Sequence, residues 1–214
     1  MVRTRIVDRS HVWAAFPAEW IKDGRLSTFL GGRRAGVSLA ALKMFITLNL
    51  RVDEDGAVNI TTQSLIDLAR VSSIGIVQAT RRLISLDMLD VTRQPSKGNK
   101  YWIKANSEWC RFPYASEPML HRLIEGAESR NLALECLKIY LIICAHAAPR
   151  SDFEMTSTSL SVMGGIPSFR IPPAIDWLVR HNLISEPRSL APRSEYGLGF
   201  TFPLSLPARS IEIF

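Results

Sequence analysis

The chain has 214 residues, of which 47% are hydrophobic and 21% charged, as expected of a globular protein with one large domain or two of about 100 residues. Its formal charge of +6 and pI near 9.5 favour an anionic partner. The most hydrophobic stretch, 132–148, includes Glu135 and Lys138 and is too short to span a bilayer comfortably, so we expect no membrane partner.

The cysteines and the missing catalytic motifs limit the chemistry. Cys110, Cys136 and Cys144 cannot all form disulfides, and none lies in a Cys-x2-Cys arrangement suited to zinc. We therefore expect a reduced, cytoplasmic setting and no metal site. The sequence has no phosphate-binding glycine loop, and its four histidines lack a nucleophile at motif spacing. These features predict no catalytic residue, no cofactor and no enzymatic activity.

In chain order, the first elements are predicted to be helical. A helix is expected over about 18–30, and a longer core helix over about 38–50 carries Leu39, Leu42, Phe45 and Ile46 on one face. The acidic turn 53–56 ends this helix, and residues 58–60 are predicted to form a short strand.

Residues 61–104 give the clearest pattern. A capped helix is expected over 61–69, a break over 70–73 and a second helix that begins at Ser73 and covers 73–86. The second helix should bury one side, formed by Ile76, Ala79, Thr80 and Leu83. Strands are predicted over 89–92 and 101–103, with a polar loop over 93–100 between them.

This order of helix, tight turn, helix and hairpin carries a family resemblance. The run Leu65, Leu68-Ala69, Val71-Ser72, Ile76, Leu83 and Leu89 resembles the winged helix-turn-helix DNA-binding domains of bacterial transcription regulators and plasmid replication initiators. It departs from them at Asp87, where a glycine usually lets the helix end in a left-handed conformation. The resemblance implies that helix 73–86 reads the major groove and that the wing, 93–100, contacts the DNA backbone.

The side chains of these two segments suit that role. Gln78, Arg81 and Arg82 carry the donors needed at base edges, with Ile74 or Val77 placed to meet a thymine methyl. Ser72 and Ser73 suit phosphate contacts at a helix start. The wing offers Arg93, Lys97, Asn99 and Lys100 to the backbone or the minor groove. The alternative is a solvated basic face, which is common on surface helices.

The sequence also repeats itself at an offset of about 95 residues. Matching pairs include Lys43 with Lys138, Thr61 with Thr156, Ile76 with Ile171, and Leu83 with Leu178. A fixed offset kept through several elements indicates duplicated units. The predicted fold class is therefore mainly α with small β-wings (α+β), as two tandem winged-helix domains over 1–105 and 106–214.

The two predicted domains differ in charge. Residues 1–105 carry sixteen Lys/Arg against nine Asp/Glu, a net +7, whereas residues 106–214 carry ten against eleven, a net −1. Attraction to phosphates supplies much of the affinity of DNA-binding proteins, so the first domain is the better DNA reader.

The second recognition helix differs in kind. It has prolines at 172 and 173, which remove two amide donors, and the outward face predicted for it carries Phe169, Asp176 and Trp177. This favours a protein contact, a dimer interface or a packing surface between the domains, with a weaker DNA contact left open.

Three functions are compatible with these sequence features. The chain is predicted to be a sequence-specific binder of double-stranded DNA in the cytoplasm, associated with the nucleoid, acting as a transcription regulator or as a plasmid or phage replication initiator. A homodimer or another protein partner would use the second domain. The alternative is a non-enzymatic protein-interaction subunit, similar to the tandem winged-helix subunits of chromosome-condensing complexes, although those are usually acidic.

Overall fold

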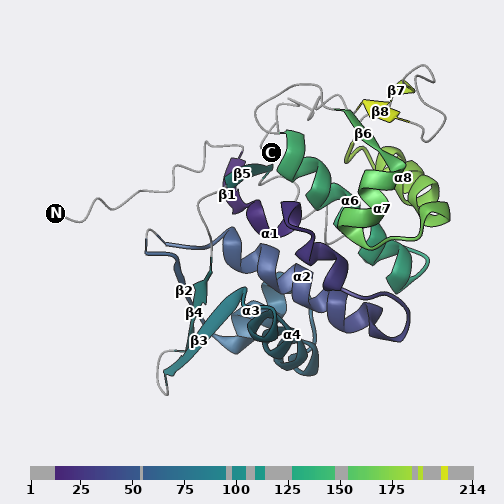
Figure 1. The fold of residues 1–214 in the computed structure, drawn as a ribbon. Helices are drawn as coiled ribbons and strands as arrows, with labels where there is room; N and C mark the ends of the chain where they lie inside the picture. Colours follow the sequence, from purple (N-terminus) through teal and green to yellow (C-terminus); the bar gives the residue numbers. More distant parts are fainter. Residues whose placement is uncertain are drawn as a thin grey trace, which may run out of the picture. The chain divides into compact units, whose positions relative to one another are not determined.

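The computed structural model describes residues 13–53, 55–94, 98–104, 109–113, 127–147, 154–184, 188–189 and 199–201. Within these ranges the protein is mainly helical with small antiparallel sheets, which confirms the α+β class (Figure 1). Lys97, one of the predicted wing residues, lies outside the described residues.

The first half of the chain contains the elements expected there, with adjusted bounds. They are β1 (Trp13–Pro17), α1 (Glu19–Lys22), η1 (Arg25–Thr28), η2 (Gly32–Arg34), α2 (Ala35–Asn49), β2 (Ala57–Ile60), α3 (Thr62–Ala69), α4 (Ser73–Ser85), β3 (Leu89–Gln94) and β4 (Gly98–Ile103). The single helix expected over 18–30 was wrong, because α1 and the 3-10 turn η1 are separate and Gly24 between them has a positive φ of 81°.

The second half contains a similar succession of elements. They are β5 (Trp109–Pro113), α6 (Arg130–Ala147), β6 (Glu154–Thr156), α7 (Ser157–Gly164), η3 (Ser168–Arg170), α8 (Ile171–Arg180), β7 (Arg188–Ser189) and β8 (Gly199–Thr201). The sheets have the strand orders β1-β5, β2-β4-β3 and β6-β8-β7.

The chain folds into two compact units that are discontinuous in sequence. The first takes its described residues from 1–20 and 29–134, and the second from 21–28 and 135–214. Contacts define these units, whereas sequence similarity defines the predicted repeats, so the repeat boundary at 105/106 stays a prediction.

The core of the first unit surrounds α2. This helix is buried on nearly all sides, including at the polar residues Ser38, Lys43, Thr47 and Asn49. Phe45 lies edge-on to the rings of Phe16 and Trp20, at centroid distances of 5.8 and 5.2 Å. The sequence predicted a core helix with one apolar face, whereas α2 is buried nearly all round, as its high apolar content allows.

The turn between α3 and α4 is fixed by caps. The side chain of Thr61 accepts from the Ser64 amide (3.0 Å) at the start of α3, and α3 ends at Arg70 in the left-handed conformation (φ 47°). Ser72 then caps α4 by accepting from the Gly75 amide at 3.2 Å. Buried Lys43 donates from Nζ to the Arg70 carbonyl (2.9 Å), which places a cation at the negative end of α3.

The hairpin after α4 is longer than predicted. Pairing runs from Leu89 with Ile103 to Gln94 with Gly98, so Arg93 and Asn99 are paired strand residues, as are Thr92 and Lys100. The prediction of a loop over 93–100 was therefore wrong, because polar strand ends carry no apolar alternation to reveal them. Asp87, just before the hairpin, takes the left-handed conformation (φ 56°) that a glycine usually provides.

The second unit contains the same local devices at the same offset. The side chain of Thr156 caps α7 by accepting from the Ser159 amide at 3.0 Å, and Gly165 (φ 57°) and Asn182 (φ 55°) are left-handed. Buried Lys138 donates to the Gly164 carbonyl (2.6 Å) at the end of α7. Its sheet order, β6-β8-β7, corresponds to β2-β4-β3.

The two aromatic-proline segments pair with each other. In the β1-β5 ladder Trp13 lies opposite Pro113, and Pro17 lies opposite Trp109. The sequence showed these segments to be alike, but no local pattern predicts that they form one sheet.

Candidate nucleic-acid interface

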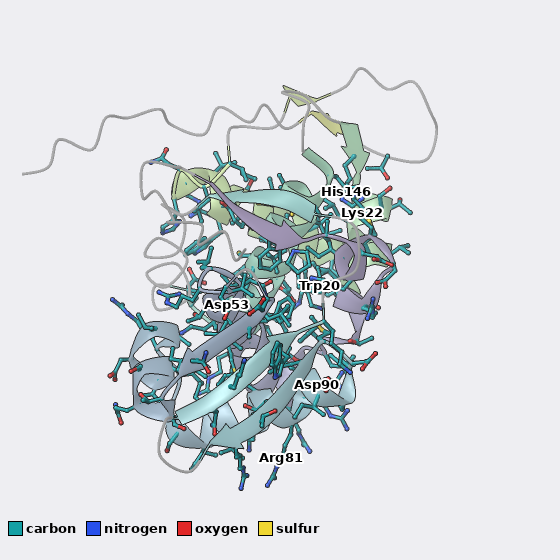
Figure 2. The ribbon with its side chains drawn as sticks, turned by 90° about the vertical axis from the view of Figure 1, so that its left-hand side faces the viewer. Trp20, Lys22, Asp53, Arg81, Asp90 and His146 are labelled. Atoms are coloured by element: carbon teal, nitrogen blue, oxygen red, sulfur yellow. The ribbon has the colours of Figure 1, made fainter. Side chains whose placement is uncertain are left out.

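The outward face of α4 is the strongest candidate site in the first unit. Ile76, Ala79 and Leu83 point inward and are buried, as predicted, which leaves the opposite face open. Gln78 and Arg81 are exposed on that face, and Figure 2 shows Arg81 pointing away from the ribbon. The helix contains no acidic residue, so no carboxylate on it opposes a phosphate.

Arg81 and Arg82 differ in accessibility. Arg82 lies at the flank of the face and is half-buried, whereas Arg81 is exposed at its centre. A helical rotation of about 100° per residue accounts for this difference, because it turns Arg82 toward the protein body. Arg81 is therefore the better placed of the two to reach a base edge.

The start of α4 is open to solvent. Ser72 and Ser73 are both exposed, and the Ser72 hydroxyl accepts from the Gly75 amide as a cap. The first amides of a helix lack intrahelical partners and favour anions. This end of α4 has the polar groups needed for a phosphate contact.

A small residue fixes how α4 approaches its neighbours. A Cβ built on Gly75 would lie 2.5 Å from Val71 Cγ1 and 3.9 Å from the Ala40 Cβ on α2. A larger side chain would therefore push α4 away from the turn before it. The absence of a side chain at Gly75 therefore lets α4 lie close to the turn and to α2.

The wing residues do not gather on one face. Arg93 and Asn99 lie opposite each other in the ladder and share a face with Tyr101, to whose Oη the Asn99 Nδ2 donates (3.2 Å). Lys100 lies on the other face, with its Nζ 4.1 Å from the centre of the Trp102 ring. Of the three described wing residues, only Arg93 is exposed, and Asn99 and Lys100 are half-buried.

The base of the hairpin is electrostatically balanced. Lys104 Nζ contacts Asp87 (2.6 Å) and Asp90 (3.2 Å), and these two carboxylates raise the pKa of Lys104. The acids therefore hold a cation at the end of the sheet away from the hairpin tip. Arg93, near that tip, has no such carboxylate beside it in its strand.

The corresponding face of the second unit is different. Phe169 is 76% exposed, and Pro172, Pro173 and Asp176 are also exposed. Trp177, however, is 6% exposed and stacks on His181 at 3.5 Å between ring centroids. The prediction that Trp177 lies on the outward face was wrong, because burial of its large ring outweighs its flanking position.

Sequence reasoning missed two features of this second unit. Val162 on α7 is 71% exposed, which adds an apolar side chain to the same unit as Phe169. Arg170 contacts Glu135 at 3.1 Å, where the first unit has the small pair Gly75 and Ala40 at the same offset. Burial raises the pKa of Glu135, although Arg170 opposes this shift. An exposed valine on a helix has no sequence signal, whereas the substitution of a small pair by opposite charges is visible once the repeats are aligned.

Two further observations concern metal binding and membrane spans. Among the described residues, no group of three or more His, Cys, Asp or Glu side chains is placed to hold a metal ion. Within the same residues, no helix combines the length and apolar character needed to cross a bilayer.

Comparisons with known proteins add no relative. No protein-family model matches the chain, and no curated protein is significantly similar to it in sequence.

Proposed function

We propose that this protein is a tandem winged-helix protein that binds double-stranded DNA sequence-specifically, as a transcription regulator or a plasmid or phage replication initiator. In this proposal α4 is the recognition helix in the major groove, and the β3-β4 hairpin is the wing beside it. The protein acts as a binding module in the cytoplasm, in association with the nucleoid.

One observation carries the proposal. α4 follows a capped three-residue turn, buries one side and exposes Gln78 and Arg81 on the other, without an acid anywhere along it. Glutamine can pair with adenine N6 and N7, and arginine with guanine O6 and N7, in the major groove. The net charge of +7 over residues 1–105 favours the same polyanionic partner.

The backbone contacts of the proposal come from the start of α4 and from the wing. Ser72, Ser73 and Arg93 are exposed and suit phosphate oxygens, whereas Lys100 is half-buried over Trp102 and reaches solvent from the opposite sheet face. Such contacts release counterions, so affinity should fall as salt rises.

The shared devices of the two units support a duplication with repeats over 1–105 and 106–214. Two threonine caps, two pairs of left-handed residues and two buried lysines recur at or next to the offset of 95. Each of these features fixes a turn or a helix end, and their recurrence at one offset is typical of duplicated units.

The second unit is proposed to serve a protein contact. Exposed Val162 and Phe169 offer apolar area, and Asp176 stands where the first unit has Arg81. A carboxylate at that position opposes a phosphate backbone. A homodimer or another protein partner therefore fits this unit better than DNA does.

The competing function is an interaction protein that binds no DNA. The apolar side chains exposed on α4 favour it, but the localised positive charge favours DNA. Selection from a random duplex library by the full chain, followed by titration at two salt concentrations, separates these functions. A palindromic motif would indicate a regulator, direct repeats an initiator, and the absence of any motif would refute the DNA proposal in favour of the interaction protein.

A further inference from the structure

The outward face of α4 carries aliphatic side chains in addition to its polar ones. Ile74 is 70% exposed and Val77 is 49% exposed, in the first turn and a half of the helix. Ile74, Gln78 and Arg81 lie along one stripe, because positions separated by four and seven residues face the same way. Val77 flanks this stripe beside Ile74.

The charge around these aliphatic groups indicates which class of partner they can contact. They lie on a helix without acids, beside Arg81 and within a repeat of net charge +7. A protein surface complementary to this face would have to be both apolar and acidic. The DNA major groove combines negative charge with one apolar group, the C5-methyl of thymine.

The helix also sets a distance. Ile74 and Arg81 are separated by seven residues, or about 10.5 Å along the axis at 1.5 Å per residue. Because a helix in the major groove lies obliquely to the duplex axis, this length covers at most about three base-pair steps of 3.4 Å. The groups read by the two ends of the stripe must lie within that interval.

We infer that Ile74, with Val77 beside it, packs against thymine C5-methyl groups, so that the DNA site has a required thymine within about three base-pair steps of the guanine read by Arg81. This inference rests on the proposed function and specifies the ligand of the same face. Gln78 lies between the two ends and faces the intervening base pairs, where adenine offers it two hydrogen bonds.

The second unit does not share this specificity. Phe169 is exposed at the position equivalent to Ile74, but Pro173 and Asp176 replace Gln78 and Arg81. The proline offers no side-chain hydrogen bond where α4 has Gln78, and Asp176 places a negative charge near the phosphates where α4 has Arg81. The thymine requirement therefore belongs to α4 alone.

The test replaces thymine with deoxyuridine, which removes only the C5-methyl group. The full chain is used to select sites from a random duplex library, and each thymine of the selected site is then replaced singly. Replacement at one thymine within about three base-pair steps of the guanine should weaken binding about fourfold, the equivalent of about 0.8 kcal/mol for one buried methyl-sized group.

Variants of the protein identify the side chain. Ile74→Ala should bind the thymine site more weakly and should lose most of its preference for thymine over deoxyuridine, with Val77→Ala as the second variant. Ile84→Ala is the matched control, since Ile84 is an exposed aliphatic residue near the other end of the same helix, and it should keep the full preference. Because Ile74 is exposed, its truncation should leave unfolding by urea nearly unchanged.

The outcomes separate the inference from the proposed function. Specific DNA binding with no effect of deoxyuridine, or an effect that survives in both Ile74→Ala and Val77→Ala, overturns the thymine inference and leaves the DNA-binding proposal in place. Failure of the full chain to select any DNA overturns both.

Discussion

Replacing Gly98 with alanine should destabilise the protein more than the same change at a glycine of similar backbone conformation. Gly98 begins β4 with φ 89°, and a Cβ there would lie 2.9 Å from the Ile60 carbonyl oxygen and 3.2 Å from Thr61 Cα. Gly56 has φ 80°, but the nearest atom to its Cβ is the Ile103 oxygen at 4.0 Å. Gly56→Ala therefore isolates the backbone strain, and Gly98→Ala adds a steric clash.

The magnitudes follow from this difference. Positive φ costs alanine about 1–2 kcal/mol, partly offset by about 0.5 kcal/mol from the reduced freedom of the unfolded chain. At Gly98 the backbone of Ile60 must also move, and such overpacking costs about 1–3 kcal/mol more. We expect losses of about 1 kcal/mol for Gly56→Ala and about 3 kcal/mol for Gly98→Ala.

Urea denaturation of the two variants and the wild type measures these losses. Gly98→Ala should also weaken the proposed DNA binding, because the close approach of Gly98 to Ile60 and Thr61 places the start of β4, and with it the wing, beside the start of α3. Losses in unfolding free energy that agree within about 0.5 kcal/mol would refute the reasoning, since the close contact at Gly98 would then carry no energy.

Three further predictions concern stability. Burial lowers the pKa of Lys138 from 10.5 to about 8. Between these two pH values the unfolded chain binds more protons than the folded chain, so the stability of the wild type should rise with pH. Measured against Lys138→Met, the rise should be about 2 kcal/mol from pH 7 to 9.5. A flat difference between the two urea profiles would contradict this. Thr47→Val should raise the unfolding free energy by about 1 kcal/mol, because the Thr47 hydroxyl is buried without a hydrogen-bond partner in the described part of the chain, and a loss on urea denaturation would show a partner for it. Thr61→Ala and Thr156→Ala should each lower the unfolding free energy by about 1 kcal/mol in the same assay, because both hydroxyls accept a hydrogen bond of 3.0 Å at the start of a helix. Unequal losses would contradict the prediction that the two caps are equivalent.

The sequence predicted the local elements of the first unit well. Helices were expected to begin near Thr61 and at Ser73, and α3 and α4 begin at Thr62 and Ser73. Ile76, Ala79 and Leu83 are buried as their spacing required. These features depend on neighbours within a few residues, which a sequence pattern contains.

Contacts between distant segments could not be predicted in the same way. The pairing of β1 with β5 joins residues more than 90 positions apart in the sequence, such as Trp13 and Pro113, and the ion pair of Arg170 with Glu135 joins two helical segments. Neither follows from periodicity, because periodicity shows which face of an element is buried and not what covers it. Aligning the repeats shows which residues correspond, but not which segments are in contact.

The errors at the candidate site have the same origin. Arg93 and Asn99 were expected in a loop, and they pair across the hairpin, because register depends on the partner strand. Trp177 was expected on an open face, and its ring stacks on His181 one turn further along the helix. Exposure of Gln78 and Arg81, by contrast, followed from the buried face opposite to them.

The most direct test of the DNA-binding proposal compares two variants at equivalent positions, Arg81→Ala in the first unit and Asp176→Ala in the second. Both side chains are exposed, so neither change should unfold the protein. Titration of a selected duplex at fixed salt should show a loss of about 1–3 kcal/mol in specific binding for Arg81→Ala and none for Asp176→Ala. Unchanged binding by Arg81→Ala, or an equal loss in both variants, would contradict the assignment of base reading to α4.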